Sequence, residues 1–218
     1  SFRGTVVWWQ GDFQNAFAYS HQALDELPEH DVFWRGNSLI TVGYQALSAG
    51  RILEAQDQLL EARALMGAAQ NIFGVLAATQ FLAEIFYQQG EFEQADQLNQ
   101  QIVKDASSVR EESMLDDEGV ASLNLAHIAY EKDELEKAES LATRAFELAV
   151  MRANEILQVQ TSLRLAQIHT ARGNFSIALE LLKSQEATIQ NSALLRELQD
   201  ARALLSIRSN DISSLDWW

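Results

Sequence analysis

A short pattern that returns about every 40 residues constrains this chain more than any other feature of its sequence. Each copy has a turn-forming residue, an apolar residue two positions later, and in most copies an alanine three positions after that. The copies begin at Gly11, Gly50, Gly90, Asp133 and Gly173, with a degraded sixth at Asn210. A fixed period of this length predicts stacked two-helix units in place of a single globular core.

Each position of the pattern has a physical role. Gly, Asp and Asn tolerate a positive φ, so the first residue ends one helix and forms the turn. The apolar residue begins the next helix, and the alanine lies where the two helices cross. A second small residue stands seven positions before each turn: Gly4, Gly43, Ala83, Ala126, Ala166 and Ala203. Large side chains at these positions would push the paired helices apart.

The pattern predicts an all-α chain whose residues 1–218 form one right-handed superhelical solenoid of about five and a half tetratricopeptide-like (TPR-like) helix-turn-helix repeats. The expected helices are 2–10, 12–27, 31–49, 51–69, 71–89, 91–106, 117–132, 134–151, 154–172, 174–188 and 191–209, with a further helix from Asp211. We expect the longest connection, Ser107 to Asp116, to be a polar loop with solvated carboxylates. Because the array ends within a unit, we expect the chain to be a fragment of a longer protein.

The charge balance excludes several partners. The chain has 31 acidic and 16 basic residues and a net charge of −15, so nucleic acid and an anionic membrane surface would repel it. No apolar run reaches the roughly 18 residues that a membrane span needs. The sequence has no cysteine, which excludes disulfides and thiolate metal sites and is compatible with a cytoplasmic protein.

Catalytic signatures are missing from the sequence. It contains no phosphate loop, no dinucleotide-binding glycine motif and no nucleophile elbow. The four histidines, His21, His30, His127 and His169, have no metal-ligand spacing. We therefore expect no enzyme activity, no cofactor and no metal.

Four segments resemble the helical sensor arm of MalT-type bacterial transcription activators, which belong to the LuxR family and are STAND NTPases. The first is Leu27-Pro28-Glu29-His30-Asp31-Val32-Phe33-Trp34-Arg35-Gly36, similar to a linker between the first and second units. The others are Asn71-Ile72-Phe73, Gln89 to Ala95 and Leu123 to Ala138. The resemblance covers residues 1 to about 190. The nucleotide-binding domain and the DNA-binding helix-turn-helix of that family lie outside these segments.

The resemblance implies a role in receiving signals. In such activators the helical arm takes up an inducer or a regulatory protein, and this controls ATP-dependent self-association of the full-length protein. The implied partners are therefore an inducer or a partner protein, together with the other domains of the full-length regulator. The alternative is a generic TPR scaffold that joins partner proteins without a transcriptional role.

TPR geometry indicates which residues would face the inner groove of such a solenoid. The candidate ligand-binding residues are Tyr44, Gln80, Glu84, Tyr87, His127, Tyr130, Gln160 and Gln167. The wider mapping adds Asn37, Gln88, Glu131 and Thr170, with Trp8 and Trp9 at the entrance.

Aromatic rings and amides dominate these positions, and no Lys or Arg occupies them through the first five units. This excludes the basic carboxylate clamp of some TPR co-chaperones and suits a small neutral polar ligand, such as a sugar, or a peptide. In the other interpretation, Tyr44, Tyr87 and Tyr130 only pack between units.

The charge and the missing phosphate loop give a first testable prediction. The isolated chain should neither hydrolyse ATP nor bind duplex DNA at physiological salt, because its net charge of −15 repels polyphosphates. A coupled ATPase assay and an electrophoretic mobility shift would check this. ATP turnover that persists after removal of contaminants would contradict it.

Overall fold

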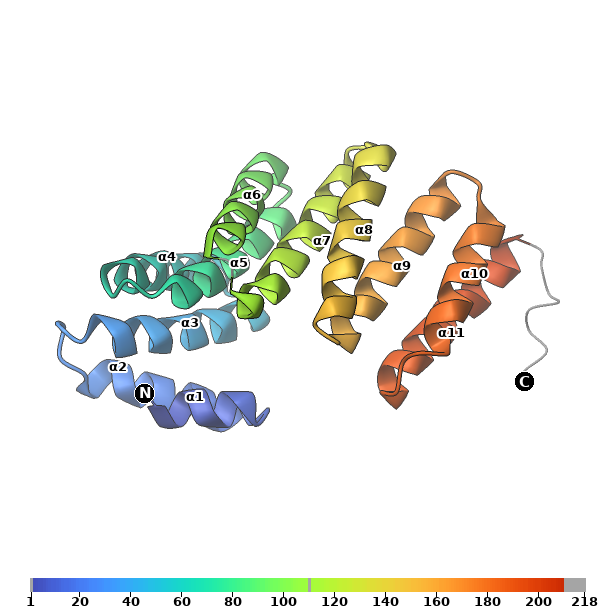
Figure 1. Cartoon of the computed structure of the whole chain (residues 1–218). Helices are drawn as coiled ribbons and strands as arrows, with labels where there is room; N and C mark the ends of the chain where they lie inside the picture. The colour runs from blue at the N-terminus through green and yellow to red at the C-terminus, as the bar shows by residue number, and fades with distance from the viewer. Residues whose placement is uncertain (1, 110, 210–218) are drawn as a thin grey trace. The chain divides into compact units, whose positions relative to one another are not determined.

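The computed structural model describes residues 2–109 and 111–209, which form eleven α-helices and a short 3-10 helix, with no strand among them. The helices are α1 (Phe2–Trp9), α2 (Phe13–Glu26), α3 (Val32–Ser48), α4 (Ile52–Ala68), α5 (Ile72–Gln88), α6 (Phe92–Val109), η1 (Glu112–Met114), α7 (Leu115–Glu131), α8 (Leu135–Met151), α9 (Glu155–Ala171), α10 (Phe175–Glu186) and α11 (Ser192–Ser209). The all-α prediction is confirmed (Figure 1). The further helix predicted from Asp211 lies outside the described residues.

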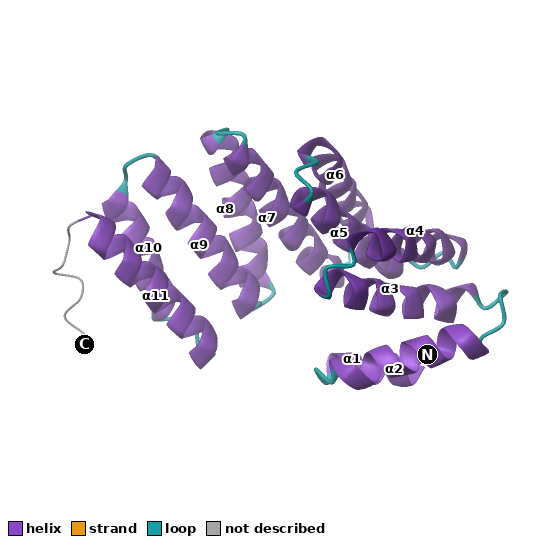
Figure 2. Ribbon diagram, turned by 180° about the vertical axis from the view of Figure 1, so that it is seen from behind, coloured by secondary structure: helices purple, strands orange, loops and turns teal. Residues whose placement is uncertain are grey.

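The chain divides into two compact units, residues 1–102 and 103–218. In the first unit, α1 to α5 each pack against the next helix, and α3 also contacts both α1 and α5. In the second unit, α7 to α11 pack in the same way, and α9 also contacts both α7 and α11. Figures 1 and 2 show α7 to α11 side by side in chain order. Packing between near neighbours in sequence is typical of helical repeats. The handedness of the superhelix stays a prediction.

The predicted turn residues adopt left-handed backbone conformations. The φ angle is +73° at Gly50, +76° at Gly90 and +59° at Asp133. At the first of these turns the Arg51 amide donates to the carbonyl oxygen of Ala46 at 2.9 Å, a hydrogen bond that closes the end of a helix. The apolar residue of each copy then begins the next helix, as predicted, at Phe13, Ile52, Phe92, Leu135 and Phe175.

Two further turns of the same kind carry no glycine. Gln70 ends α4 at φ +52°, and Ala153 ends α8 at φ +51°. Each is followed by an asparagine whose side-chain oxygen caps the next helix: Asn71 accepts from Gly74 N at 2.7 Å, and Asn154 from Leu157 N at 3.1 Å. The α4–α5 and α8–α9 connections between repeats therefore use the same left-handed geometry as the turns within repeats, whereas the α2–α3 connection leaves its helix in an extended conformation at Leu27.

The predicted crossing positions are closely packed. Ala83, Ala126 and Ala166 are buried, and Ala126 shares an apolar cluster with Ala138 of α8. A Cβ on Gly43 would lie 2.8 Å from Cγ of Leu59, which is closer than two carbon atoms can approach. The small residues are thus required by the contact between helices.

The connection between α6 and α7 differs from the sequence prediction. α6 continues to Val109 and α7 begins at Leu115, so the predicted polar loop from Ser107 to Asp116 is largely helical. The acidic residues from Asp116 onward lie in the first turn of α7. Negative charge is favourable at the positive end of a helix, which explains the earlier helix start.

The left-handed turns give a matched pair of stability predictions. Gly90→Ala should lower the free energy of unfolding by about 1 kcal/mol, because a side chain disfavours positive φ although it would meet no atom there. Ala153→Gly should raise it by about 0.5–1 kcal/mol, since it removes the same strain. Urea denaturation of both variants tests this, and changes of the same sign would contradict it.

The crossing positions give a third prediction. Ala126→Leu should lower the free energy of unfolding by about 1–3 kcal/mol, because the added carbons have no space between α7 and α8. Ala64→Leu, at an exposed position of α4, is the control and should change it little. Equal effects of both substitutions in chemical denaturation would show that the crossing is not tight.

Candidate functional site

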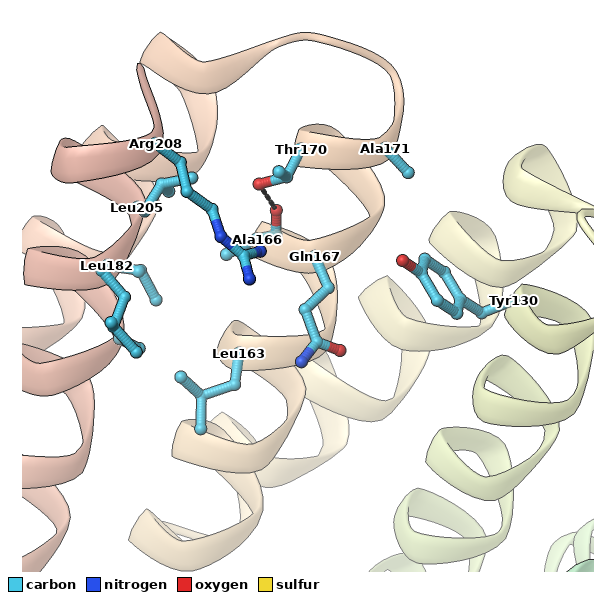
Figure 3. Close-up of a pocket in the computed structure, with 11 residues that line it drawn as sticks. Tyr130, Leu163, Ala166, Gln167, Thr170, Ala171, Leu182, Leu205 and Arg208 are labelled. Carbon is cyan, nitrogen blue, oxygen red and sulfur yellow. Dashed lines mark hydrogen bonds between the residues drawn. The ribbon is translucent and has the colours of Figure 1, made fainter. Parts of the chain in front are cut away.

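The second unit contains a cavity of about 350 Å³, formed by the last turn of α7, α9, α10 and α11 (Figure 3). Its size lies within the range of small-molecule sites, at the lower end. The lining residues are Tyr130 from α7, Leu163, Ala166, Gln167, Thr170 and Ala171 from α9, Leu182 from α10, and Ala201, Leu204, Leu205 and Arg208 from α11.

The repeat geometry creates this space. Tyr130 and Thr170 each stand three residues before a turn, at Asp133 and Gly173, so they occupy equivalent positions on α7 and α9. Small side chains such as Ala166 line the cavity between them. The deepest lining residue is Leu182, which is 1% exposed. The result is an apolar floor beneath a polar rim.

Three polar side chains of the rim have no partner within the described part of the chain. The Tyr130 hydroxyl, the Gln167 amide and the Arg208 guanidinium make no side-chain hydrogen bond or ion pair there, and Figure 3 shows all three directed toward the cavity. Thr170 differs, because its hydroxyl donates to the carbonyl oxygen of Ala166 at 2.7 Å. The free groups are therefore chiefly hydrogen-bond donors.

Tyr130 and His127 share a cationic neighbour. The guanidinium of Arg164 lies 5.0 Å from the centre of the Tyr130 ring, in a cation–π contact. Burial lowers the pKa of His127 to about 4, with a smaller contribution from the charge of Arg164. His127 is therefore neutral at physiological pH.

The structure brings two of the eight candidate residues into the cavity: Tyr130 and Gln167. His127 and Gln160 belong to the same unit but do not line it, and Gln160 is exposed. Thr170, from the wider mapping, does line it.

The other four candidates lie in the first unit. Glu84 accepts a hydrogen bond from Nε2 of Gln88 at 2.7 Å, and Tyr87 lies 5.6 Å from Phe92, centre to centre. Gln80 is half-buried on α5.

Tyr44 packs between repeats. Its ring centre lies 5.0 Å from that of Trp8 on α1 and 5.2 Å from that of Phe81 on α5. The three rings join the first helices of three successive units. At this position the structure supports the packing interpretation, because the ring's surface is occupied by other rings.

Sequence mapping missed two arginines. Arg208 belongs to α11, beyond the five units that were mapped, and Arg164 lies on α9 between the mapped residues Gln160 and Gln167. A regular 40-residue period could have extended the mapping to α11, but the last turn of the pattern is degraded. The absence of Lys and Arg at mapped positions therefore does not make the cavity neutral.

The acidic cluster at the start of α7 is structural. Glu118 is buried and its Oε1 accepts from Nη2 of Arg144 at 2.8 Å, while Asp116 Oδ2 accepts from Nε of Arg152 at 3.1 Å. Burial, and then the Asp116 charge, raise the pKa of Asp117 to about 6. The expectation of solvated carboxylates holds for Glu111 and Glu112, which are exposed, but was wrong for the carboxylates from Asp116 onward, because basic side chains of α8 and the turn after it partly cover them.

The described residues lack the features of a metal site and of a membrane-spanning helix. No group of three His, Asp or Glu side chains there could hold a metal ion. None of the helices in the same residues is long and apolar enough to cross a bilayer.

The position of His127 gives a prediction about pH. Its ring should titrate near pH 4, since the folded protein disfavours the charged form. The unfolded chain then binds more protons between about pH 6.5 and 4, so this part of the stability is present above pH 6.5 and is lost as the pH falls through 4. NMR titration of the ring measures it. Arg164→Met should raise the pKa only partly, because burial is the larger cause, and a midpoint near 6.5 in the unaltered chain would contradict the assignment.

Solved structures share the fold. The TPR-like repeats of a putative kinesin light chain from Podosopora anserina match with a TM-score of 0.66 and 18% identity, over 84% of this chain and 89% of that one. BtubC (BKLC) from P. vanneervenii matches with a TM-score of 0.63 and 19% identity, over 93% of this chain and 78% of that one. These matches confirm the TPR-like repeat fold.

Sequence comparison gives the family. No curated protein matches the chain significantly. A family model described as the MalT-like TPR region matches residues 1–218, which includes the stretch after residue 190 that the sequence motifs left uncovered. The chain therefore belongs to the MalT-like TPR region family.

Proposed function

We propose that the chain is the signal-receiving arm of an ATP-dependent MalT-type transcription activator of the LuxR family, and that it acts in the cytoplasm without catalysis of its own. The observation that carries the proposal is the match of all 218 residues to the MalT-like TPR region. The cavity of the second unit adds a place where an inducer can bind.

The position of the cavity explains how binding would act on the arm. Its lining comes from α7, α9, α10 and α11, which belong to three successive repeats. A ligand that touches all of them favours one arrangement of these helices over others. An effector shifts an equilibrium only through such a difference in affinity. Ligand binding would thereby change the arm that the rest of the regulator contacts.

The candidate residues divide into two roles under this proposal. Tyr130 and Gln167 contact the inducer directly, by ring stacking and by amide hydrogen bonds. In the first unit, Gln80, Glu84 and Tyr87 remain candidates for contacts to a peptide or a regulatory protein, whereas the Tyr44 ring is occupied by packing against Trp8 and Phe81.

A scaffold that joins partner proteins is the second candidate function. Three apolar side chains around the turn from α8 to α9 are exposed: Val150 at 52%, Met151 at 65% and Ile156 at 59%. Exposed apolar side chains grouped in this way are found at protein interfaces. A scaffold role needs these residues and does not need the cavity.

The complete reading frame separates the two candidates. The regulator predicts a phosphate loop upstream of this segment and a basic helix-turn-helix downstream. A frame that encodes neither would leave the scaffold as the function.

Variants of Tyr130 test the sensor role directly. In the full-length protein, Tyr130→Ala should weaken the response to inducer, because loss of a stacked ring costs about 0.5–1.5 kcal/mol beyond the lost contact area. Tyr130→Phe keeps the ring and should retain more of the response. A promoter reporter measures both variants, with circular dichroism as the check on folding. A normal response from Tyr130→Ala would contradict a ligand contact at this residue. Tyr87→Ala applies the same test to the first unit.

A further inference from the structure

We propose that the cavity of the second unit binds a small organic monoacid, with its carboxylate on Arg208 and its apolar body on the leucine floor. This proposal deepens the sensor function proposed above, on which it rests, because it names the chemical class of the ligand. It departs from the neutral ligand expected from sequence.

Arg208 is the group that would recognise the carboxylate. Its guanidinium points into the cavity and has no hydrogen-bond or ion-pair partner among the residues that the structure describes (Figure 3). A guanidinium presents a planar set of N–H donors that matches the two oxygens of a carboxylate. An unpaired arginine that borders a cavity is thus suited to an acid.

Two exposed arginines of α11 in the second unit, Arg196 and Arg208, make no ion pair with any described residue, and of the two only Arg208 lines the cavity. Four other arginines of this unit are engaged by carboxylates, in the pairs Arg144–Glu118, Arg152–Asp116, Arg172–Glu139 and Arg202–Glu186. The chain has nearly twice as many acidic as basic residues, so a cation is readily neutralised from within. Arg208 has no such pair among residues 2–109 and 111–209, and it lies beside the cavity.

The floor of the cavity would hold the apolar part of the ligand. Leu182 and Leu205 are buried at its base, and Leu163 and Leu204 extend the apolar lining. Contact with these side chains removes apolar ligand surface from water, which favours binding. A ligand without an apolar part would make no contact with these leucine side chains.

The remaining rim groups favour a ligand that accepts hydrogen bonds. The Tyr130 hydroxyl and the Gln167 amide can both donate, and the Thr170 hydroxyl already donates to Ala166. α7, α9 and α11 all end beside the cavity, at Glu131, Ala171 and Ser209. Helix C-termini carry partial negative charge, which disfavours a doubly charged phosphate more than a singly charged carboxylate.

The test is an NMR titration of the chain with three probes that share one alkyl group: hexanoate, hexan-1-ol and hexylammonium. Hexanoate should bind about tenfold more tightly than hexan-1-ol, because one charge-assisted hydrogen-bonded contact to Arg208 increases affinity by about that factor. Its chemical-shift changes should concentrate on the lining residues, and added salt should weaken hexanoate but not hexan-1-ol.

Substitutions at Arg208 complete the test. Arg208→Gln should weaken hexanoate binding about tenfold and leave hexan-1-ol unchanged. Arg196→Gln is the matched control, since Arg196 is exposed on the same helix and does not line the cavity. Arg208→Lys keeps the charge and should retain part of the affinity. Thermal melts check that each variant is folded. The salt dependence of hexanoate binding to the unaltered chain tests the charge contact without any substitution.

Three results would overturn the proposal: hexanoate binding no tighter than hexan-1-ol, tighter binding of hexylammonium, or equal binding by Arg208→Gln. A peptide whose affinity does not depend on its free carboxylate would also count against it, because the site would then be a protein-binding surface. Each outcome is distinct from failure of the sensor function, which depends on how the full-length regulator responds. That function could stand with a different ligand, and acid binding could stand in a scaffold.

Discussion

The structure depends on close contact between the two helices of each pair. Ala126 of α7 meets Ala138 and Ala142 of α8 in one buried cluster, and Leu165 and Ile168 of α9 cover it. Small side chains let the helix backbones approach, and the larger residues around them fill the remaining space. Each pair thus presents an apolar face to the next, and the array extends by repeating this contact.

The left-handed turns determine which residues of successive repeats occupy equivalent positions. Because each turn fixes where a helix ends, residues at the same distance before it occupy equivalent places in successive units. Tyr130 and Thr170 are such a pair, and both line the cavity. The turns at Gln70 and Ala153, each between two repeats, adopt the same left-handed geometry without glycine.

Much of the fold could be predicted from sequence, because the repeat is a local signal. Helix starts such as Phe92 and Leu135 follow from a turn residue and a fixed spacing. The acidic residues in the first turn of α7 are also a local signal, but their ion pairs with Arg144 and Arg152 depend on another helix and its following turn and could not be predicted. The cavity was partly predictable: Tyr130 and Gln167 follow from the repeat, but Arg208 depends on how α11 packs where the pattern has decayed.

We propose that this arm controls the assembly of a larger regulator. Sedimentation velocity of the full-length protein with ATP, compared with a form that lacks residues 1–218, tests it most directly. Under this proposal, removing the arm should change the ATP-dependent distribution of oligomers, because the arm would bias the equilibrium between resting and active states. The same distribution with and without the arm would contradict it.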